Sequence, residues 1–503
     1  MHGDPAAITL ERYRLAELAA IAAERRSLDL HPDVRARIQA GARHVASQVE
    51  RGRTVYGVTT GFGALAERAI PRSQLSELQH RHVVSHACGV GPFAPEAISR
   101  LALLIKLLTF RGGHTGITVE TVERLLELWN RGAVPAIPLQ GTVGASGDLA
   151  PLAHMALPLL GLGHVHAGDR IAPAGEVLAG QPPVRLEPKE GLALTNGIQF
   201  ISAIAVHCVL ECARLARAAD AIASLSIQGF SAARDFFAAR YHETSLHRER
   251  GVVAGNLRAL LDGGNHHELR TAVASRQDPY SFRCIPQVHG AVRQTIRFAH
   301  ETIEDEVNGV SDNPLFFPDE DLVLCGGALH GESIAMVLDF LAIAASELAS
   351  ISERRTYQLL SGRRGLPDFL VAEPGLNSGF MVAQYTAASL VNHNKVLCTP
   401  ASIDTIPTCQ LQEDHVSMGG TSGIKLLQIL DNCAVVLGIE LLAAAQAVAL
   451  NEGLVLSERT APIVRELRRS VAPLREDRVL ADDIAEARRF VDRELPRWTE
   501  ALA

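Results

Sequence analysis

The sequence predicts a mainly α protein with a loop-rich N-terminal region followed by a bundle of long helices. Apolar residues recur at three- and four-residue spacing through most of the 503-residue chain, segments of β-branched alternation are short and few, and the composition changes near residue 200. Gly- and Pro-rich loops alternate with modest helices before that point, and long helices dominate after it. We therefore divide the chain into an N-terminal region, residues 1–200, and a helical region, residues 201–503.

Helical periodicity marks eight segments. Five have the amphipathic pattern of helices with one buried face: 33–50, 95–109, 119–131, 201–226 and 286–308. Three are apolar and rich in Ala and Leu, which predicts helices packed closely in the middle of a bundle: 328–354, 380–397 and 419–450. Short strands are expected at 7–9, 168–172 and 184–186, with small hairpins near 164–187.

Composition restricts the function classes. Hydrophobic residues make up 47% and charged residues 21% of the chain, as in ordinary globular proteins. The net charge of −8 and the lack of a basic tract argue against a nucleic-acid partner. No signal peptide is evident, and polar residues interrupt the apolar stretches well short of the ~18 residues of a membrane span, so no membrane partner is expected. Eight cysteines without a CxxC pair fit a reduced, cytoplasmic setting.

The most informative segment is GTVGASGDLAPLAH, residues 141–154. Taken alone, it has a simple structural interpretation, with Gly144 to Gly147 as a flexible turn, Asp148 as a helix N-cap and Pro151 as a first-turn proline. The wider string GTVGASGDLAPLAHMAL closely resembles the signature of the aromatic amino acid ammonia-lyase and aminomutase family. The resemblance covers nearly the whole chain through several separate strings, is closest to the histidine ammonia-lyases, and implies the fold of that family.

In that family the Ala-Ser-Gly tripeptide cyclises with loss of two waters to 4-methylidene-imidazol-5-one (MIO), a backbone electrophile. The resemblance implies that Ala145, Ser146 and Gly147 form MIO here, with no metal or nucleotide. The residue types suit this chemistry, because the nitrogen of Gly147 must attack a carbonyl two residues back and a side chain would block the approach. Ser146 supplies the hydroxyl that leaves. The electrophile makes the substrate amine a better leaving group, which is a cofactor's task carried out by the backbone.

Other family strings carry the remaining catalytic residues. Tyr56 in YGVTTGFG matches the tyrosine proposed to remove the β-proton, a role that needs a lowered pKa or a charged neighbour; the alternative is a packed loop aromatic. Asn196 in EGLALTNGIQ matches the asparagine beside the MIO carbonyl and the substrate amine; the alternative is a tight Asn-Gly turn. Tyr280 and Arg283 in QDPYSFRCIPQ match a second tyrosine and the arginine that binds the α-carboxylate. Four further amides fall on family strings. Gln277 and Gln287 are expected as supporting groups. Asn313 and Asn377 also match, and for each the alternative is a turn or helix cap.

Two segments indicate which aromatic amino acid is used. His86 lies in VVSHACGVG, where the family's histidine ammonia-lyases carry Ser-His. Gln412 and Glu413 lie in QEDHVSMG, also typical of the histidine enzymes, and an imidazole requires such an acceptor whereas a phenyl ring does not. The alternative for Glu413 is a structural ion pair. Two departures, Leu329 in place of an aromatic that lines the pocket and Gln410 in the segment before QEDH, favour a modified or bulkier substrate or an aminomutase outcome.

The leading hypothesis is an MIO-dependent ammonia-lyase that converts L-histidine to urocanate. The alternatives are a 2,3-aminomutase, which returns ammonia to the β-carbon, a lyase acting on tyrosine or phenylalanine, and a catalytically inactive helical scaffold that leaves Ser146 intact. The family forms homotetramers whose active sites draw residues from three subunits, and the long Ala-rich helices suit such a core. No metal site is expected, because the histidines are scattered and His266-His267-Glu268 lacks the spacing of HExxH.

Overall fold

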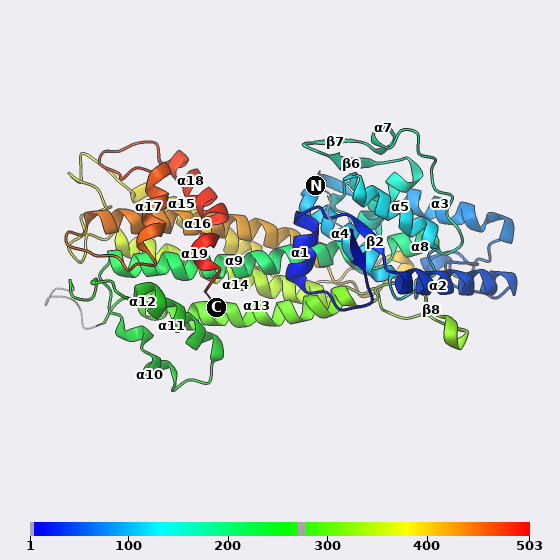
Figure 1. Cartoon of the computed structure of the whole chain (residues 1–503), viewed down its shortest axis with the longest axis horizontal. Helices are drawn as coiled ribbons and strands as arrows, with labels where there is room; N and C mark the ends of the chain where they lie inside the picture. The colour runs from blue at the N-terminus through cyan, green and yellow to red at the C-terminus, as the bar shows by residue number, and fades with distance from the viewer. Residues whose placement is uncertain (1–4, 270–276, 503) are drawn as a thin grey trace. The chain divides into compact units, whose positions relative to one another are not determined.

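The structure is a computed structural model that describes residues 5–269 and 277–502. Helices account for 58% of the chain, which confirms the predicted mainly α class (Figure 1). The chain forms two compact units, each assembled from three segments. Unit 1 consists of Met1–Cys208, His300–Asp339 and Pro400–Ile424. Unit 2 consists of Val209–Ala299, Phe340–Thr399 and Lys425–Ala503.

Unit 1 surrounds a helix that is buried almost from end to end, α4 (Glu96–Phe110), in which every residue from Ile98 onward is buried. The other helices of this unit are α1 (Leu15–Ala23), α2 (Pro32–Glu50), α3 (Leu75–His86), α5 (Val119–Asn130), α6 (Leu149–Ala156), α7 (Ala174–Val177) and α8 (Glu190–Thr195). Its 3-10 helices are η1 (Gly63–Leu65), η2 (Arg72–Gln74), η3 (Leu157–Leu160), η5 (Pro318–Glu320) and η6 (Cys409–Leu411).

The strands of unit 1 are short and form four small sheets. They are β1 (Ala6–Ile8), β2 (Leu28–Leu30), β3 (Val90–Phe93), β4 (Val134–Pro135), β5 (Pro138–Gln140), β6 (His164–Ala167), β7 (Arg170–Pro173), β8 (Leu315–Phe317) and β9 (Leu322–Leu324). β1 pairs with β2 in parallel, whereas β3–β5, β8–β9 and the sheet β4–β6–β7 are antiparallel.

The predicted strand near residues 7–9 and the predicted hairpin of β6 and β7 are confirmed. The strand predicted at 184–186 is wrong, because the segment runs beside η3 and bonds to it through Val184, whose N–H donates to the carbonyl of Leu159 at 2.8 Å.

Unit 2 is dominated by four long helices that run side by side (Figure 1). They are α9 (Gln199–Gly229), α13 (Ile285–Asn308), α14 (Glu332–Leu359) and α16 (Gly419–Leu450), whose ends extend into segments of unit 1. The remaining helices of this unit are η4 (Asp235–Phe237), α10 (Ala239–His242), α11 (Arg248–Leu261), α12 (Tyr280–Arg283), α15 (Met381–Leu397), α17 (Ala461–Ser470), α18 (Leu480–Arg493) and α19 (Pro496–Thr499).

A buried polar network joins the four long helices within unit 2. Arg355 of α14 donates to both carboxylate oxygens of Glu440 on α16, at 2.5 and 2.8 Å. Ser226 of α9 donates to the same carboxylate at 2.6 Å. His289 of α13 contacts Asp220 of α9 at 2.7 Å. Since all five side chains are buried, the network restricts which helix faces can meet in the bundle.

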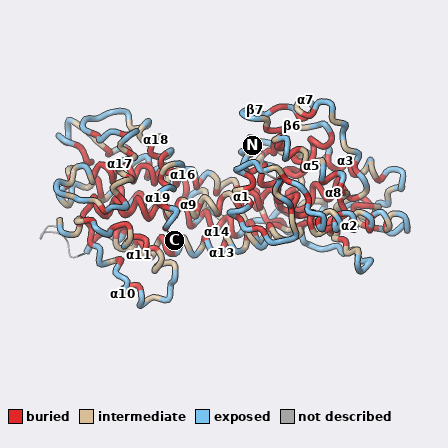
Figure 2. Tube along the Cα trace, viewed as in Figure 1, coloured by how far each residue is buried: buried red, intermediate tan, exposed pale blue. Residues whose placement is uncertain are grey.

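The eight predicted helical segments all form, although α14 begins at Glu332 rather than at 328. Three of the helices, α9, α14 and α16, are long and apolar enough to cross a membrane by length and composition. The expectation that apolar stretches end well short of a span is therefore wrong for these helices. Between 67% and 78% of their most apolar windows is buried inside the protein, as the long buried stretches of α9 and α16 in Figure 2 illustrate.

Candidate active site

The Ala-Ser-Gly tripeptide lies in a tight turn between β5 and α6. Gly147 has a φ of 73°, in the left-handed region, and a Cβ at this position would stand 2.0 Å from the carbonyl oxygen of Gly197. The N–H of Asp148 donates to the same carbonyl at 2.7 Å. Because the backbone of another segment is so close, only glycine fits at position 147 without rearrangement. The chain is thus compressed at the point where the sequence predicts ring closure.

Asp148 holds the C-terminal side of this turn. Asp148 is the N-cap residue of α6, as its simple structural interpretation predicted, but its carboxylate makes no capping bond to that helix. Oδ2 instead accepts the N–H groups of Phe200 and Ile201 in the first turn of α9, at 3.0 and 2.9 Å. Oδ1 accepts the hydroxyl of Thr142 at 3.0 Å. Burial raises the pKa of Asp148 to about 7.

The N-terminal side of the turn is fixed by two loops that are distant in sequence. The carbonyl oxygen of Gly144 accepts the N–H of Gly331 and the hydroxyl of Ser417, both at 3.2 Å. The N–H of Met418 donates to the carbonyl of Val143 at 2.9 Å. The turn is therefore hydrogen-bonded to the two loops that carry Leu329 and Glu413.

Glu413 contacts the tripeptide directly. The hydroxyl of Ser146 donates to Oε1 of Glu413, and the hydroxyl of Thr408 donates to Oε2 at 2.6 Å. In the described parts of the chain the partners of this half-buried carboxylate are hydroxyls rather than a cation. Thr408 went unrecognised in the sequence, where nothing distinguishes it from other loop threonines.

The segment before Glu413 is strained. Cys409, Gln410 and Leu411 have φ values of 49°, 54° and 70°, which non-glycine residues rarely adopt. Gln412 is exposed, and its N–H donates to the carbonyl of Cys409 at 3.2 Å. Leu329 is half-buried in the glycine-rich loop before α14. The two departures from the histidine enzymes thus lie on the two loops that meet at the turn.

Tyr56 is half-buried, and its hydroxyl oxygen accepts the N–H of Gly63 at 2.9 Å. Burial raises the pKa of this phenol, and the bond from Gly63 offsets only part of the effect. The direction is opposite to the lowered pKa that the sequence analysis required of a base. A proton-accepting Tyr56 therefore needs a further positive or hydrogen-bonding group near its oxygen, or alkaline pH.

His86 ends a stack of three rings. The ring centroids of Phe62 and His82 are 3.9 Å apart, and those of His82 and His86 are 4.0 Å apart. Nδ1 of His86 lies 2.7 Å from the carbonyl oxygen of His82. A carbonyl can only accept, so Nδ1 carries the hydrogen of the neutral ring. Burial lowers the pKa of His86, which leaves Nε2 as an acceptor.

Asn196 is buried directly beside the turn. Its Nδ2 donates to the carbonyl of Asn313 at 2.9 Å, and its Oδ1 accepts the N–H of Gly197 at 3.2 Å. Nζ of Lys106, on buried α4, donates to the carbonyl of Asn196 at 2.6 Å. Burial lowers the pKa of Lys106 to about 7. The sequence signal for Lys106 was a single lysine inside the apolar run LALLIKLLTF.

The remaining predicted residues belong to unit 2. Tyr280 is 69% exposed on the short helix α12, and the guanidinium of Arg283 lies 4.3 Å from its ring centroid. Nε of Arg283 is buried without a hydrogen-bond partner among the described residues. Gln277 is exposed near the start of the same segment. Asn377 stabilises a turn, as its structural alternative predicted, by donating to the carbonyl of Ala372 at 3.1 Å.

The predicted site residues thus fall into two groups. Unit 1 holds the residues of the turn and six others: Tyr56, His86, Ala145, Ser146, Gly147, Asn196, Leu329, Gln412 and Glu413. Unit 2 holds Gln277, Tyr280 and Arg283.

Comparison with known proteins identifies the family. The sequence pattern of the aromatic amino acid lyases matches residues 13–469. The chain belongs to this family. The aromatic amino acid lyase described here is 44% identical over 501 residues to a histidine ammonia-lyase of Anaeromyxobacter dehalogenans (strain 2CP-C), a match that spans 97% of this chain and 98% of the relative.

Solved structures agree with this assignment. The lyase is similar to histidine ammonia-lyase from Trypanosoma cruzi, with a TM-score of 0.91 and 38% identity, over 99% of this chain and 95% of the other. It is equally similar to a tyrosine aminomutase from Streptomyces globisporus, with a TM-score of 0.93 and 34% identity over 99% of both chains. The family and the fold predicted from the sequence are confirmed.

Proposed function

We propose that this lyase is a histidine ammonia-lyase that converts L-histidine to urocanate and ammonia, using MIO formed from Ala145, Ser146 and Gly147. The contact between Ser146 and Glu413 carries the proposal, because it puts an acceptor for an imidazole N–H against the residue that would bear the electrophile. The histidine ammonia-lyases among the curated relatives support the choice of substrate.

The turn fits the MIO group. Gly147 is held against Gly197 where no side chain could stand, and Ala145 is 5% exposed, so the two residues on either side of the half-buried Ser146 are buried. Asp148, tied to the N-terminus of α9, fixes the residue after the ring. When formed, the group supplies an electrophile for the α-amine of the substrate.

The residues around the turn can select an imidazole. Glu413 can accept a hydrogen bond from one nitrogen of the substrate's imidazole ring. Nε2 of His86 is a second acceptor, because Nδ1 of the same ring is bonded to the carbonyl of His82. A phenyl ring would offer these half-buried acceptors no hydrogen bond, whereas an imidazole can donate to one of them. Tyr56 takes the β-proton, and Asn196 orients the amine beside the turn.

Arg283 binds the substrate carboxylate in a bidentate pair, with Tyr280 beside it. We propose that these two residues complete the active site of another copy of the chain in a homotetramer. The 69% exposure of Tyr280 supports this role, as does the buried Nε of Arg283, which has no hydrogen-bond partner among the described residues and which a carboxylate would supply with one. The eight cysteines, all free in the structure, support a cytoplasmic location.

A 2,3-aminomutase is the second candidate. The likeness to tyrosine aminomutase favours it, as does Leu329 in place of an aromatic, because a changed pocket wall alters how long ammonia is retained beside the product.

One experiment tests both candidates. Purified protein is incubated without added cofactor with histidine, tyrosine, phenylalanine and ring-methylated histidines, and ammonia, urocanate and β-amino acids are measured. The proposal expects urocanate and ammonia from histidine in equal amounts. A β-amino acid, resolved by chiral analysis, would establish the aminomutase instead. Failure to release ammonia or form a β-amino acid from any aromatic amino acid would reject both.

A further inference from the structure

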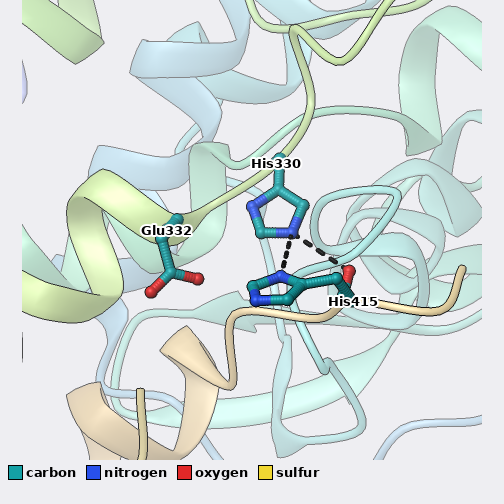
Figure 3. Close-up of side chains that lie close together, drawn as sticks. All are labelled: His330, Glu332 and His415. Carbon is teal, nitrogen blue, oxygen red and sulfur yellow. Dashed lines mark hydrogen bonds between the residues drawn. The ribbon is translucent and has the colours of Figure 1, made fainter. Parts of the chain in front are cut away.

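Three potential metal ligands converge beside the turn, on segments of unit 1 that are far apart in the sequence (Figure 3). His330 precedes α14, Glu332 is the first residue of that helix, and His415 lies in the loop before α16. One ring nitrogen of each histidine and one carboxylate oxygen all lie within 4.8 Å of one another. Nothing in the proposed lyase chemistry uses these three side chains.

The histidine geometry is close to that of a metal site. Nε2 of His330 lies 3.4 Å from Nδ1 of His415 and 3.1 Å from the carbonyl oxygen of the same residue, the two contacts that are dashed in Figure 3. Two nitrogen ligands of a tetrahedral Zn²⁺, each about 2.0–2.1 Å from the ion, lie about 3.3–3.4 Å apart. The separation places both nitrogens within reach of one ion without movement of the backbone. To bind the ion, Nε2 of His330 exchanges its contact with the carbonyl oxygen of His415 for the metal, in the tautomer that carries the hydrogen on Nδ1.

The third ligand is a carboxylate with unused capacity. Oε2 of Glu332 is buried and has no hydrogen-bond partner among the described residues. Leaving a carboxylate oxygen without water or a donor is unfavourable, and a cation between it and the two histidines would remove that cost. A small rotation of this flexible side chain closes the distance to an ion held by the two rings.

The backbone on both sides of the cluster is already fixed. The N–H of Gly331, between two of the ligands, donates to the carbonyl of Gly144 at 3.2 Å. The N–H of Val416, next to His415, donates to the hydroxyl of Thr405 at 2.9 Å. The ligands are therefore held on anchored loops, and binding an ion would cost little ordering of the chain.

We propose that His330, Glu332 and His415 form a site for a divalent transition-metal ion of the Zn²⁺ class. Two imidazoles and one carboxylate match the donors of Zn²⁺ and its neighbours, whereas Mg²⁺ and Ca²⁺ prefer oxygen ligands alone. His415 is exposed, so a remaining coordination position is open to water or a small ligand. The ion would connect the loop of Leu329 to the loop of Glu413, the two loops that carry the departures Leu329 and Gln410.

Metal titration of the purified full-length protein tests the site. Equilibrium dialysis with Zn²⁺ is expected to give one tightly bound ion per chain. His415→Ala, His330→Gln and Glu332→Gln should each weaken its binding by about tenfold or more, since even the outer partners of metal ligands affect affinity by about 10–100-fold. His80→Ala is the matched control, because His80 is an exposed histidine near Glu77 on α3 and lies outside the cluster. Circular dichroism and gel filtration confirm that each variant is folded.

Co²⁺ provides the second measurement, because its absorption spectrum separates nitrogen and oxygen ligands from thiolates. The proposal expects no thiolate charge-transfer band in wild type and loss of the Co²⁺ signal in His415→Ala. Zn²⁺ should also raise the Tm of wild type and of His80→Ala, but not that of His415→Ala. Three results would each overturn the proposal. Folded His415→Ala and His330→Gln could bind Zn²⁺ as tightly as wild type, wild type could bind no ion, or the Co²⁺ spectrum could contain a thiolate band.

Discussion

The two groups of site residues differ in how completely the folded chain holds them. Around the turn in unit 1, Ser146, Asp148 and Asn196 all have defined partners, most of them at or below 3.2 Å. On α12 in unit 2, Tyr280 is mostly exposed, and the guanidinium of Arg283 lies over its ring with one nitrogen that has no partner among the described residues. This difference is what the proposed function requires, in which the first group carries chemistry on the chain's own backbone and the second meets a ligand or another copy.

The largest loss of activity is expected from a substitution in the first group, at the turn itself. Ser146→Ala removes the hydroxyl that must leave, so ammonia release from histidine should fall by roughly a thousandfold or more, as when a group that acts in the transition state is lost. Ser76→Ala, which removes a hydroxyl bonded to Leu186 elsewhere in unit 1, should keep activity within about twofold. Comparable rates for the Ser146 variant and wild type would mean that the turn is not the reacting group.

The second group is tested by mixing chains. Arg283→Leu should lower kcat/KM for histidine about a hundredfold, because a bidentate, charged carboxylate contact is lost. If Arg283 serves another copy, co-refolding this variant with Ser146→Ala should restore up to about a quarter of wild-type activity, since some sites then receive both intact groups.

No recovery in mixed assemblies that are confirmed by gel filtration would place both groups in the same copy. Each variant refolded alone serves as the control for reactivation without exchange.

The raised pKa of Tyr56 predicts the pH profile. A base must be deprotonated to act, and burial lifts the pKa of this phenol above its ordinary value of 10, so the reactive fraction grows as pH rises. The kcat for histidine should increase by up to about tenfold per pH unit from 7 to 9. Residual kcat of Tyr56→Phe should be nearly flat over this range, and an identical slope in the variant would exclude Tyr56 as the group that titrates.

Substrate selection should show the smallest effect. Glu413→Gln removes the charge but keeps an oxygen acceptor, so kcat/KM for histidine should fall about tenfold. The ratio of histidine to phenylalanine turnover should fall with it, because only an imidazole uses the acceptor. An unchanged ratio would show that Glu413 stabilises the turn and does not bind the substrate ring.

The fold was predictable because its main elements are local. Helical periodicity located eight helices, since one sequence stretch suffices to show which face is buried, although it missed others of similar length such as α11 and α18. The strand at 184–186 was wrong because pairing depends on a partner segment, and the partner of Val184 turned out to be the 3-10 helix that contains Leu159. The apolar lengths of α9, α14 and α16 were underestimated because isolated polar residues were given too much weight.

The site residues were likewise predictable only where the signal is local in the sequence. The tripeptide could be recognised because its residues are contiguous and Gly147 has a stated steric purpose. The real partners of Asp148, the N–H groups of Phe200 and Ile201, could not be recognised because they lie some fifty positions away. The same holds for His330 and His415, whose nitrogens meet across 85 residues. Side-chain spacing along the chain carries no information about contacts of this kind.

The mass of the purified wild-type chain tests the central claim most directly. Cyclisation and dehydration at Ala145, Ser146 and Gly147 should leave the mature protein lighter than its sequence by two water molecules, with the difference confined to the peptide that contains Ser146. The Ser146→Ala chain should not show this loss of two waters. A full sequence mass in wild-type protein that releases ammonia from histidine would contradict the account.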